Sequence, residues 1–249
     1  MNAINEPNRR SVLDDVRSAL GRRTTLSPAP LEPFIQPAAK IDLHKLIERF
    51  TEEATAVRAQ VHYISPKSPE GREPADPADR LKSVGQIGTL VAEICHTAAA
   101  SEIAVSNTGF IAGMDLTEQL TAQGYSVFVP DNTSLGHDQI VVRLANCGAG
   151  LTAADYAIAE TGTIVLSSDE PNASLVSLLP PLHIALVRSE QMIATMEEAI
   201  SRIGSEQIGR TKPARSVTLI TGPSRTSDVE LVLSIGVHGP KELHVIILD

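Results

Sequence analysis

The residues from 152 to 163 combine a carboxylate, hydroxyls and a glycine in one short stretch. Glu160 is followed directly by Thr161, Gly162 and Thr163. A carboxylate whose environment perturbs it can act as a general base or a nucleophile, and the glycine lets a ligand approach the backbone closely. Glu160 is therefore the candidate catalytic residue, and the three residues after it are candidate ligand contacts. Taken alone, such a stretch is more often a tight turn with a solvent-facing carboxylate.

A second polar stretch follows the apolar run at residues 217–220. Its turn offers hydroxyls, backbone N–H groups and a guanidinium, from Thr221, Gly222, Ser224, Arg225 and Thr226. Ser227 and Glu230 have the spacing of a capping box, which predicts that a helix begins near Ser227. The positive end of that helix beside Arg225 would suit a phosphate or carboxylate. The alternative, equally consistent with the pattern, is a capped turn in which Arg225 pairs with an acidic neighbour such as Asp228.

Three further features carry weaker signals. Residues 106–113 form another turn with hydroxyls and glycines after a strand-like run. His238 is a candidate for orienting a ligand or moving a proton, although a histidine in such a place more often hydrogen-bonds a turn. The pair His137 and Asp138 is a poor candidate for metal ligation, and the spacing of the seven histidines predicts no metal site.

Short apolar runs alternate with helical patterns along most of the chain. Several runs are apolar throughout, as in strands buried on both faces of a parallel sheet. The alternation predicts an α/β fold with an open, mostly parallel sheet and helices on both sides. Strands are expected at residues 61–64, 102–106, 126–129, 163–166, 184–187, 217–220 and 243–248. Helices are expected at residues 42–57, 81–99, 114–123 and 190–203, with Ile200 facing inward, whereas residues 139–145 fit either structure and residues 65–79 read as a surface loop.

The expected position of the polar turns follows from this fold. In open α/β sheets, ligands bind beyond the carboxyl ends of the strands. We therefore expect the turns at residues 106–113, 160–163 and 221–226 to lie at that edge. The last two are expected to converge on one pocket suited to a negatively charged ligand.

The first 40 residues are predicted to be an arm that precedes an α/β domain at residues 41–249. Apolar residues on one face predict a short amphipathic helix at residues 11–20, and four prolines make residues 24–39 an extended tether. Such an arm either docks on its own body, or docks on another subunit of a homo-oligomer, or stays a free terminus.

The composition excludes several classes of partner. The 249-residue chain has 21 Lys+Arg against 30 Asp+Glu, a formal charge of −9, and only 3% aromatic residues, which argues against nucleic-acid binding. Cys95 and Cys147 are far apart and predict buried reduced thiols rather than a disulfide, a zinc site or an iron–sulfur cluster. No run is long and apolar enough for membrane insertion, and no signal peptide is recognisable. We therefore expect a cytoplasmic protein.

Three motifs together resemble one family. They are Thr152-x-Ala-Asp-Tyr-Ala-Ile-Ala-Glu-Thr-Gly-Thr163, Thr221-Gly-Pro-Ser-Arg-Thr-x-Asp228 and Val237-His-Gly-Pro240. Each is weak alone, but the three in this order resemble the lactate utilisation protein C family, which carries the LUD domain. The likeness covers nearly the whole chain, including the N-terminal stretch from Val12 to Arg22, and is strongest after Thr152.

The resemblance implies a fold and a function. The fold would be a Rossmann-like three-layer α/β architecture, similar to the ribose-phosphate isomerase, sugar-phosphate deaminase and coenzyme A transferase group. The function would be participation in bacterial L-lactate oxidation to pyruvate beside two iron–sulfur partner proteins, which would carry the clusters while this chain binds no cofactor. A small anionic or nucleotide-like ligand would occupy the turns at 160–163 and 221–226. The alternatives are a stand-alone isomerase or coenzyme A transferase-like enzyme that uses Glu160, and a structural partner whose turns bind nothing.

Overall fold

The computed structural model describes residues 14–15, 18, 42–64, 77–106, 108–130, 134–168, 173–207, 214–227, 233–236 and 238–249. The chain divides into two compact units, Met1–Phe34 and Ile35–Asp249. In the first unit, Asp14, Asp15 and Ser18 are helical. The rest of the helix predicted at residues 11–20, and the whole tether, lie outside the described residues. The predicted boundary at residue 40 stays a prediction.

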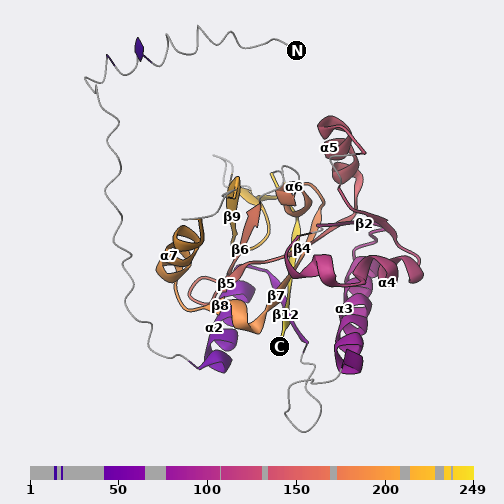
Figure 1. Cartoon of the computed structure of the whole chain (residues 1–249), viewed down its shortest axis with the longest axis horizontal. Helices are drawn as coiled ribbons and strands as arrows, with labels where there is room; N and C mark the ends of the chain where they lie inside the picture. The colour runs from indigo at the N-terminus through magenta and orange to yellow at the C-terminus, as the bar shows by residue number, and fades with distance from the viewer. Residues whose placement is uncertain are drawn as a thin grey trace. The chain divides into compact units, whose positions relative to one another are not determined.

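The second unit is built on a parallel sheet of six strands (Figure 1). Their order is β1-β12-β7-β4-β2-β3, and all their pairings are parallel. The strands are β1 (Gln60–Ile64), β2 (Glu102–Val105), β3 (Ser126–Phe128), β4 (Ala149–Ala153), β7 (Leu182–Arg188) and β12 (Glu242–Leu248). Every residue of β7 except Arg188 is buried, and every residue of β12 except Glu242 is buried. Apart from one histidine in each strand, these buried residues are apolar, as in a sheet that is covered on both faces, which confirms the predicted fold class.

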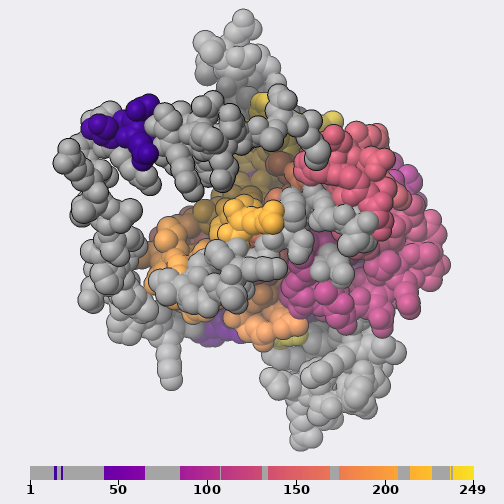
Figure 2. All heavy atoms as spheres, turned by 45° about the horizontal axis from the view of Figure 1, so that its top comes forward, coloured from indigo at the N-terminus to yellow at the C-terminus, as the bar shows by residue number. Residues whose placement is uncertain are grey.

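Alternate residues of the central strands pack into two different layers. Ile184, Leu186 and Ile246 join one core with α3 (Pro77–Thr97), the 3₁₀ helix η1 (Gly109–Gly113) and α4 (Leu116–Ala122). Ala185 and Val245 join another core with α2 (Leu43–Ala56). Near β2 and β3, the second layer continues with α5 (His137–Asn146) and α6 (Ala173–Leu178). The architecture is therefore three-layered. Figure 2 shows rose atoms of α5 on one side of the visible face and orange atoms from around α7 on the other.

A second sheet lies in the same layer as α2. Its order is β8-β5-β6-β9, from β5 (Tyr156–Ile158), β6 (Thr163–Ser168), β8 (Met192–Ile193) and β9 (Ser216–Ile220). β6 pairs antiparallel with both β5 and β9. One side of this sheet packs against α7 (Met196–Gln207), through Ile158, Val165, Ile193 and Ala199. The sequence predicted β6 and β9 as strands but did not separate them from the central sheet.

Two helix predictions need correction. The helix expected to begin near Ser227 is wrong, because residues Arg225–Ser227 form β10, which pairs antiparallel with β11 (Leu233–Ile235). The capping-box spacing is a local signal, and strand pairing decides this segment instead. The helix expected at 190–203 begins only at Met196, after the 3₁₀ helix η2 (Ser189–Gln191) and β8, and Ile200 is 61% exposed rather than inward-facing.

The remaining local predictions hold more closely. Asp42 caps α2 by accepting the N–H of His44, and the ambiguous residues 139–145 lie within α5. α3 begins at Pro77, inside the expected 65–79 loop, whose residues 65–76 lie outside the described part of the chain.

Candidate functional site

The turns at 160–163 and 221–226 meet through a chain of hydroxyl groups. Thr163 Oγ1 lies 2.7 Å from Thr161 Oγ1 and 2.7 Å from Thr221 Oγ1. The contact arises because β6 and β9 pair with Ile164 opposite Ile220, so the residues just beyond that pair are brought side by side. Thr163 is fully buried, whereas Thr221 is exposed. The structure thus brings together the two segments that the sequence singled out.

Both glycines of these turns abut the C-terminal end of α2. Gly162 has a φ of +61°, and a Cβ there would come within 2.2 Å of the Ala54 nitrogen. Gly222 has a φ of +82°, and a Cβ there would lie 2.6 Å from the Val57 carbonyl oxygen. The close backbone approach that the sequence predicted for a ligand is therefore made by a helix of the same chain.

Arg225 binds the same helix end. Its guanidinium donates a hydrogen bond to the carbonyl oxygen of Val57, the C-cap residue of α2. Basic side chains commonly satisfy the last carbonyls of a helix in this way. The acceptor is neutral, in contrast to the acidic neighbour that the sequence offered as the alternative partner.

Glu160 lies at the start of another helix. Its carboxylate accepts the backbone N–H of Met196, the first residue of α7, at 3.0 Å. Thr195 and Glu198 complete this end, since Thr195 Oγ1 accepts the N–H of Glu198 and the Glu198 carboxylate accepts the N–H of Ala194. A carboxylate in this place is stabilised by the helix dipole. Catalysis by Glu160 stays a prediction.

The motif at 237–240 packs on the turn that contains Ser224. Ser224 donates its N–H to the carbonyl of Pro240 at 2.8 Å, and its carbonyl accepts the N–H of Gly236 at 3.0 Å. A Cβ on Gly239 would lie 3.2 Å from the Ser224 Cβ. His238 is exposed, and the side chain of Thr226 lies outside the described residues.

These turns lie near the amino ends of the central strands, not beyond the carboxyl ends. Pro240 is two residues before β12, and Lys241 donates its N–H to Pro181, one residue before β7. Val57 likewise lies three residues before β1. The expectation from the general rule for α/β sheets is therefore wrong for these turns, because the second sheet and α2 carry the chain back across the face of the first.

The third predicted turn does lie at the carboxyl edge. Ser106 Oγ is 2.8 Å from Thr108 Oγ1, and the Ser106 N–H bonds the Leu151 carbonyl of β4. The chain leaves β2 toward β3 and leaves β4 toward β7, so the strand order reverses at this point. Nearby at the end of β7, Arg188 lies over the Phe110 ring, 4.6 Å from its centroid. The sequence did not single out Arg188.

The sequence also missed two histidine contacts, one of them buried and the other partly buried. His183 Nε2 lies 2.8 Å from Thr152 Oγ1, and His183 Nδ1 has no hydrogen-bond partner in the described chain. His62 Nε2 lies 3.0 Å from His244 Nδ1, and their rings stack. Burial lowers the pKa of His183 to about 3, and burial followed by the charge of His62 lowers the pKa of His244 to about 4. The sequence signal that could have revealed these contacts is a histidine within an apolar strand run, at His183 and at His244.

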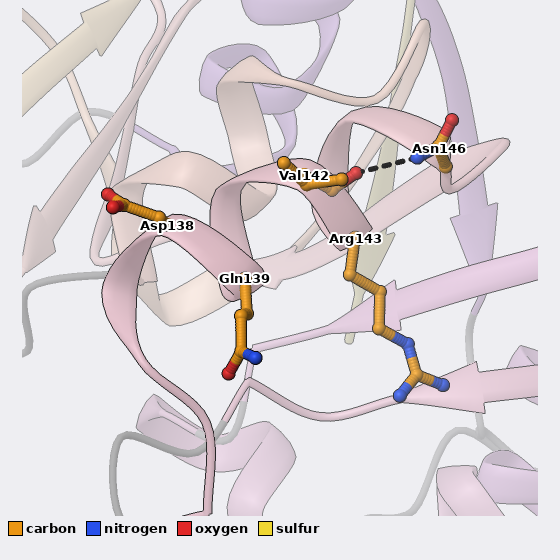
Figure 3. Close-up of a pocket in the computed structure, with 5 residues that line it drawn as sticks. All are labelled: Asp138, Gln139, Val142, Arg143 and Asn146. Atoms are coloured by element: carbon orange, nitrogen blue, oxygen red, sulfur yellow. Dashed lines mark hydrogen bonds between the residues drawn. The ribbon is translucent and has the colours of Figure 1, made fainter.

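Surface hollows are found on two helices. One of about 510 Å³ lies on α5, where Asp138, Gln139, Val142, Arg143 and Asn146 line it (Figure 3). Another of about 600 Å³ lies along α3, beside Thr89 and Glu93. In Figure 3, Gln139 and Arg143 extend from the same side of α5, and Arg143 pairs with Glu102 at 3.1 Å. Neither hollow includes a residue that the sequence singled out as a ligand contact.

The described residues contain neither a metal-binding cluster nor a membrane-spanning helix. There, no three histidine, cysteine, aspartate or glutamate side chains gather closely enough to hold a metal ion. None of the described helices has the length and apolar character needed to cross a bilayer.

The LUD domain family matches residues 47–248, most of the chain. The chain belongs to the LUD domain family. Its curated relatives include a protein named Lactate utilization protein C from Oceanobacillus iheyensis, which is 30% identical over 55% of this chain and 58% of the relative. A protein of the same name from Deinococcus radiodurans is 38% identical over 47% of this chain and 52% of the relative. The chain thus spans about half the length of these relatives.

Two other similar proteins match this chain over most of their own length. Lactate utilization protein C from Shouchella clausii is 24% identical over 97% of this chain and 98% of the relative. A crystal structure of a DUF162 family protein from Deinococcus radiodurans superposes with a TM-score of 0.54 and 22% identity, covering 84% of this chain and 99% of that one. At this level of identity the superposition shows a shared fold.

Proposed function

We propose that this LUD domain protein is a cytoplasmic component of bacterial L-lactate utilisation, in which L-lactate is oxidised to pyruvate together with iron–sulfur partner proteins. The observation that carries the proposal is the family match over residues 47–248, combined with relatives named Lactate utilization protein C. The name belongs to the relatives, and the same role for this chain is the proposal.

The two cysteines support a division of labour with such partners. Cluster ligands must be thiolates, and Cys95 and Cys147 are both buried. Burial raises the pKa of the Cys95 thiol to about 12 and that of Cys147 to about 11. Both thiols therefore remain protonated near neutral pH, which suits packing rather than cluster ligation.

The proposed ligand is a small anion at the turns 160–163 and 221–226. The guanidinium of Arg225 is bonded to a neutral carbonyl, so its charge remains available to an anion. A bond from the guanidinium to a carboxylate or phosphate, in which both groups are charged, is stronger than its bond to the neutral Val57 carbonyl. Near Arg225, the hydroxyls of Thr161, Thr163 and Thr221 form a chain, and Thr221 at its end is exposed.

Growth and co-purification test the proposal. A strain that lacks this gene should grow normally on glucose and poorly on L-lactate, and a plasmid copy should restore growth on lactate. A tagged copy should retain iron–sulfur proteins during purification from lactate-grown cells. Normal growth on L-lactate, together with no co-purifying iron–sulfur protein, would refute the role.

A further inference from the structure

β9 is the outer strand of the second sheet. Its pairing with β6 runs over five residues, from Ser216 opposite Ser168 to Ile220 opposite Ile164. Among the described strands, none pairs with the other side of β9. The backbone groups on that side form a row of donors and acceptors that another strand can pair with.

This strand lacks the features that protect sheet edges. Charged residues, prolines and bulges usually prevent an edge strand from pairing with another chain. β9 reads Ser-Val-Thr-Leu-Ile, without a charge, a proline or a glycine. Two apolar side chains on one of its faces remain open to solvent, Val217 at 39% and Leu219 at 47%.

The exposed face of β9 continues the face of β6 that α7 covers. Leu219 is opposite Val165 of β6, and Val165 is buried beneath α7. The helix covers β5 and β6 at this point but leaves the side chains of β9 exposed. A surface of this kind is suited to burial against a matching strand.

We infer that two copies of this protein associate through β9, paired antiparallel about a two-fold axis at Thr218. A two-fold interface must be self-complementary. In this register, Val217 lies opposite Leu219 of the partner subunit, and the same apolar pair occurs again across the axis. The two sheets would become one continuous eight-stranded sheet, and the absence of charge in the strand avoids repulsion across the axis.

The inference is independent of the proposed role in lactate utilisation. Pairing of five residues buries less surface than the roughly 1,200–2,000 Å² of a standard stable interface. We therefore expect a reversible dimer with a dissociation constant on the order of tens of micromolar. Sedimentation velocity from about 1 to about 200 μM should show the mass rising from that of a monomer toward that of a dimer.

Two double variants test the register. V217K/L219K places like charges opposite each other across the axis and should weaken the dimer at least about 10-fold. V217E/L219K places opposite charges there and should retain the dimer within about three-fold of the wild-type dissociation constant. Val142→Lys, at an exposed apolar residue of α5, is the matched control and should leave the mass unchanged.

A crosslink tests the axis itself. Thr218→Cys places one cysteine of each copy at the two-fold axis, where oxidation should join the chains, while the native cysteines are buried. Circular dichroism and the melting temperature confirm that each variant is folded. A wild-type protein that is monomeric at about 200 μM, or a dimer weakened equally by both double variants, overturns the inference.

Discussion

The backbone of Gly162 lies directly against that of Ala54. A Cβ atom built at Gly162 would come within 2.2 Å of the Ala54 nitrogen, and Gly162 also has a φ of +61°. The Glu-Thr-Gly-Thr motif is therefore the surface on which the last turn of α2 rests. This contact gives the motif a structural task that its sequence does not reveal.

Gly162→Ala should consequently destabilise the protein strongly. The left-handed backbone and the contact with α2 both oppose a methyl group, and together they should lower the free energy of unfolding by about 2–4 kcal/mol. Gly204→Ala in α7 is the matched control, because nothing lies within 4 Å of its Cβ position. That control should raise stability by about 0.5–1 kcal/mol. Urea unfolding of both variants measures the difference, and equal midpoints would contradict the close contact.

Arg225→Ala separates the structural and binding roles of the guanidinium. Loss of the bond to the Val57 carbonyl should lower the free energy of unfolding by about 0.5–1.5 kcal/mol. If an anion binds there, its affinity should fall by about 1.5–3 kcal/mol in addition. Thermal shifts with and without L-lactate or phosphate measure both effects. If the variant is destabilised but an anion raises its melting temperature as much as that of the wild type, Arg225 only stabilises the end of α2.

Glu160→Gln tests the alternative of an enzyme that uses Glu160. The amide still accepts the Met196 N–H but loses the negative charge at the start of α7, which should cost about 0.3–1 kcal/mol of stability. If Glu160 is a nucleophile, the wild-type protein should be labelled covalently by an acyl-coenzyme A and the variant should not. Mass spectrometry of intact protein reads the label, and failure to label the wild type removes the nucleophilic role.

Acid should destabilise the protein through its buried histidines. Burial lowers the pKa of His183 to about 3 and that of His244 to about 4, from 6.5. Between pH 6.5 and these lowered pKa values, the unfolded chain binds more protons than the folded protein does. The stabilisation is therefore fully present above pH 6.5 and is lost as the pH falls toward 4. The loss of stability should therefore grow steadily as the pH falls below 6.5, and urea unfolding at several pH values measures it.

A double variant isolates the contribution of His183. T152V/H183L removes both partners of the buried hydrogen bond, so neither is left unpaired. Urea unfolding at several pH values should show that the variant loses less stability on acidification than the wild type does. An unchanged pH dependence would show that His183 is not responsible.

Ala99→Gly should stabilise the end of α3. Ala99 is exposed and has a φ of +53°, a conformation that glycine adopts without steric cost. We expect a gain of about 0.5–1 kcal/mol in the free energy of unfolding. Ala98→Gly is the matched control, since Ala98 lacks the positive φ and should lose stability on the same change. A loss at both positions would contradict the assigned backbone geometry.

Local patterns in the sequence determined much of the central sheet. The apolar runs of β7 and β12 predicted strands covered on both faces, and three different motifs together predicted the LUD domain family. Asp42 before an amphipathic stretch marked the start of α2. These features depend on residues close together in the chain, and their side chains already carry the information.

The tertiary structure alone decided how these elements meet. An apolar run such as residues 217–220 fits either of two sheets, and only its pairing with β6 assigns it to the second. A strand, β10, stands where the local spacing favoured a helix, because residues Arg225–Ser227 pair antiparallel with β11. Whether Gly162 faces a ligand or Ala54 likewise depends on a helix more than a hundred residues earlier in the sequence. Such contacts are fixed by pairing and packing between separate segments, which no spacing within either segment records.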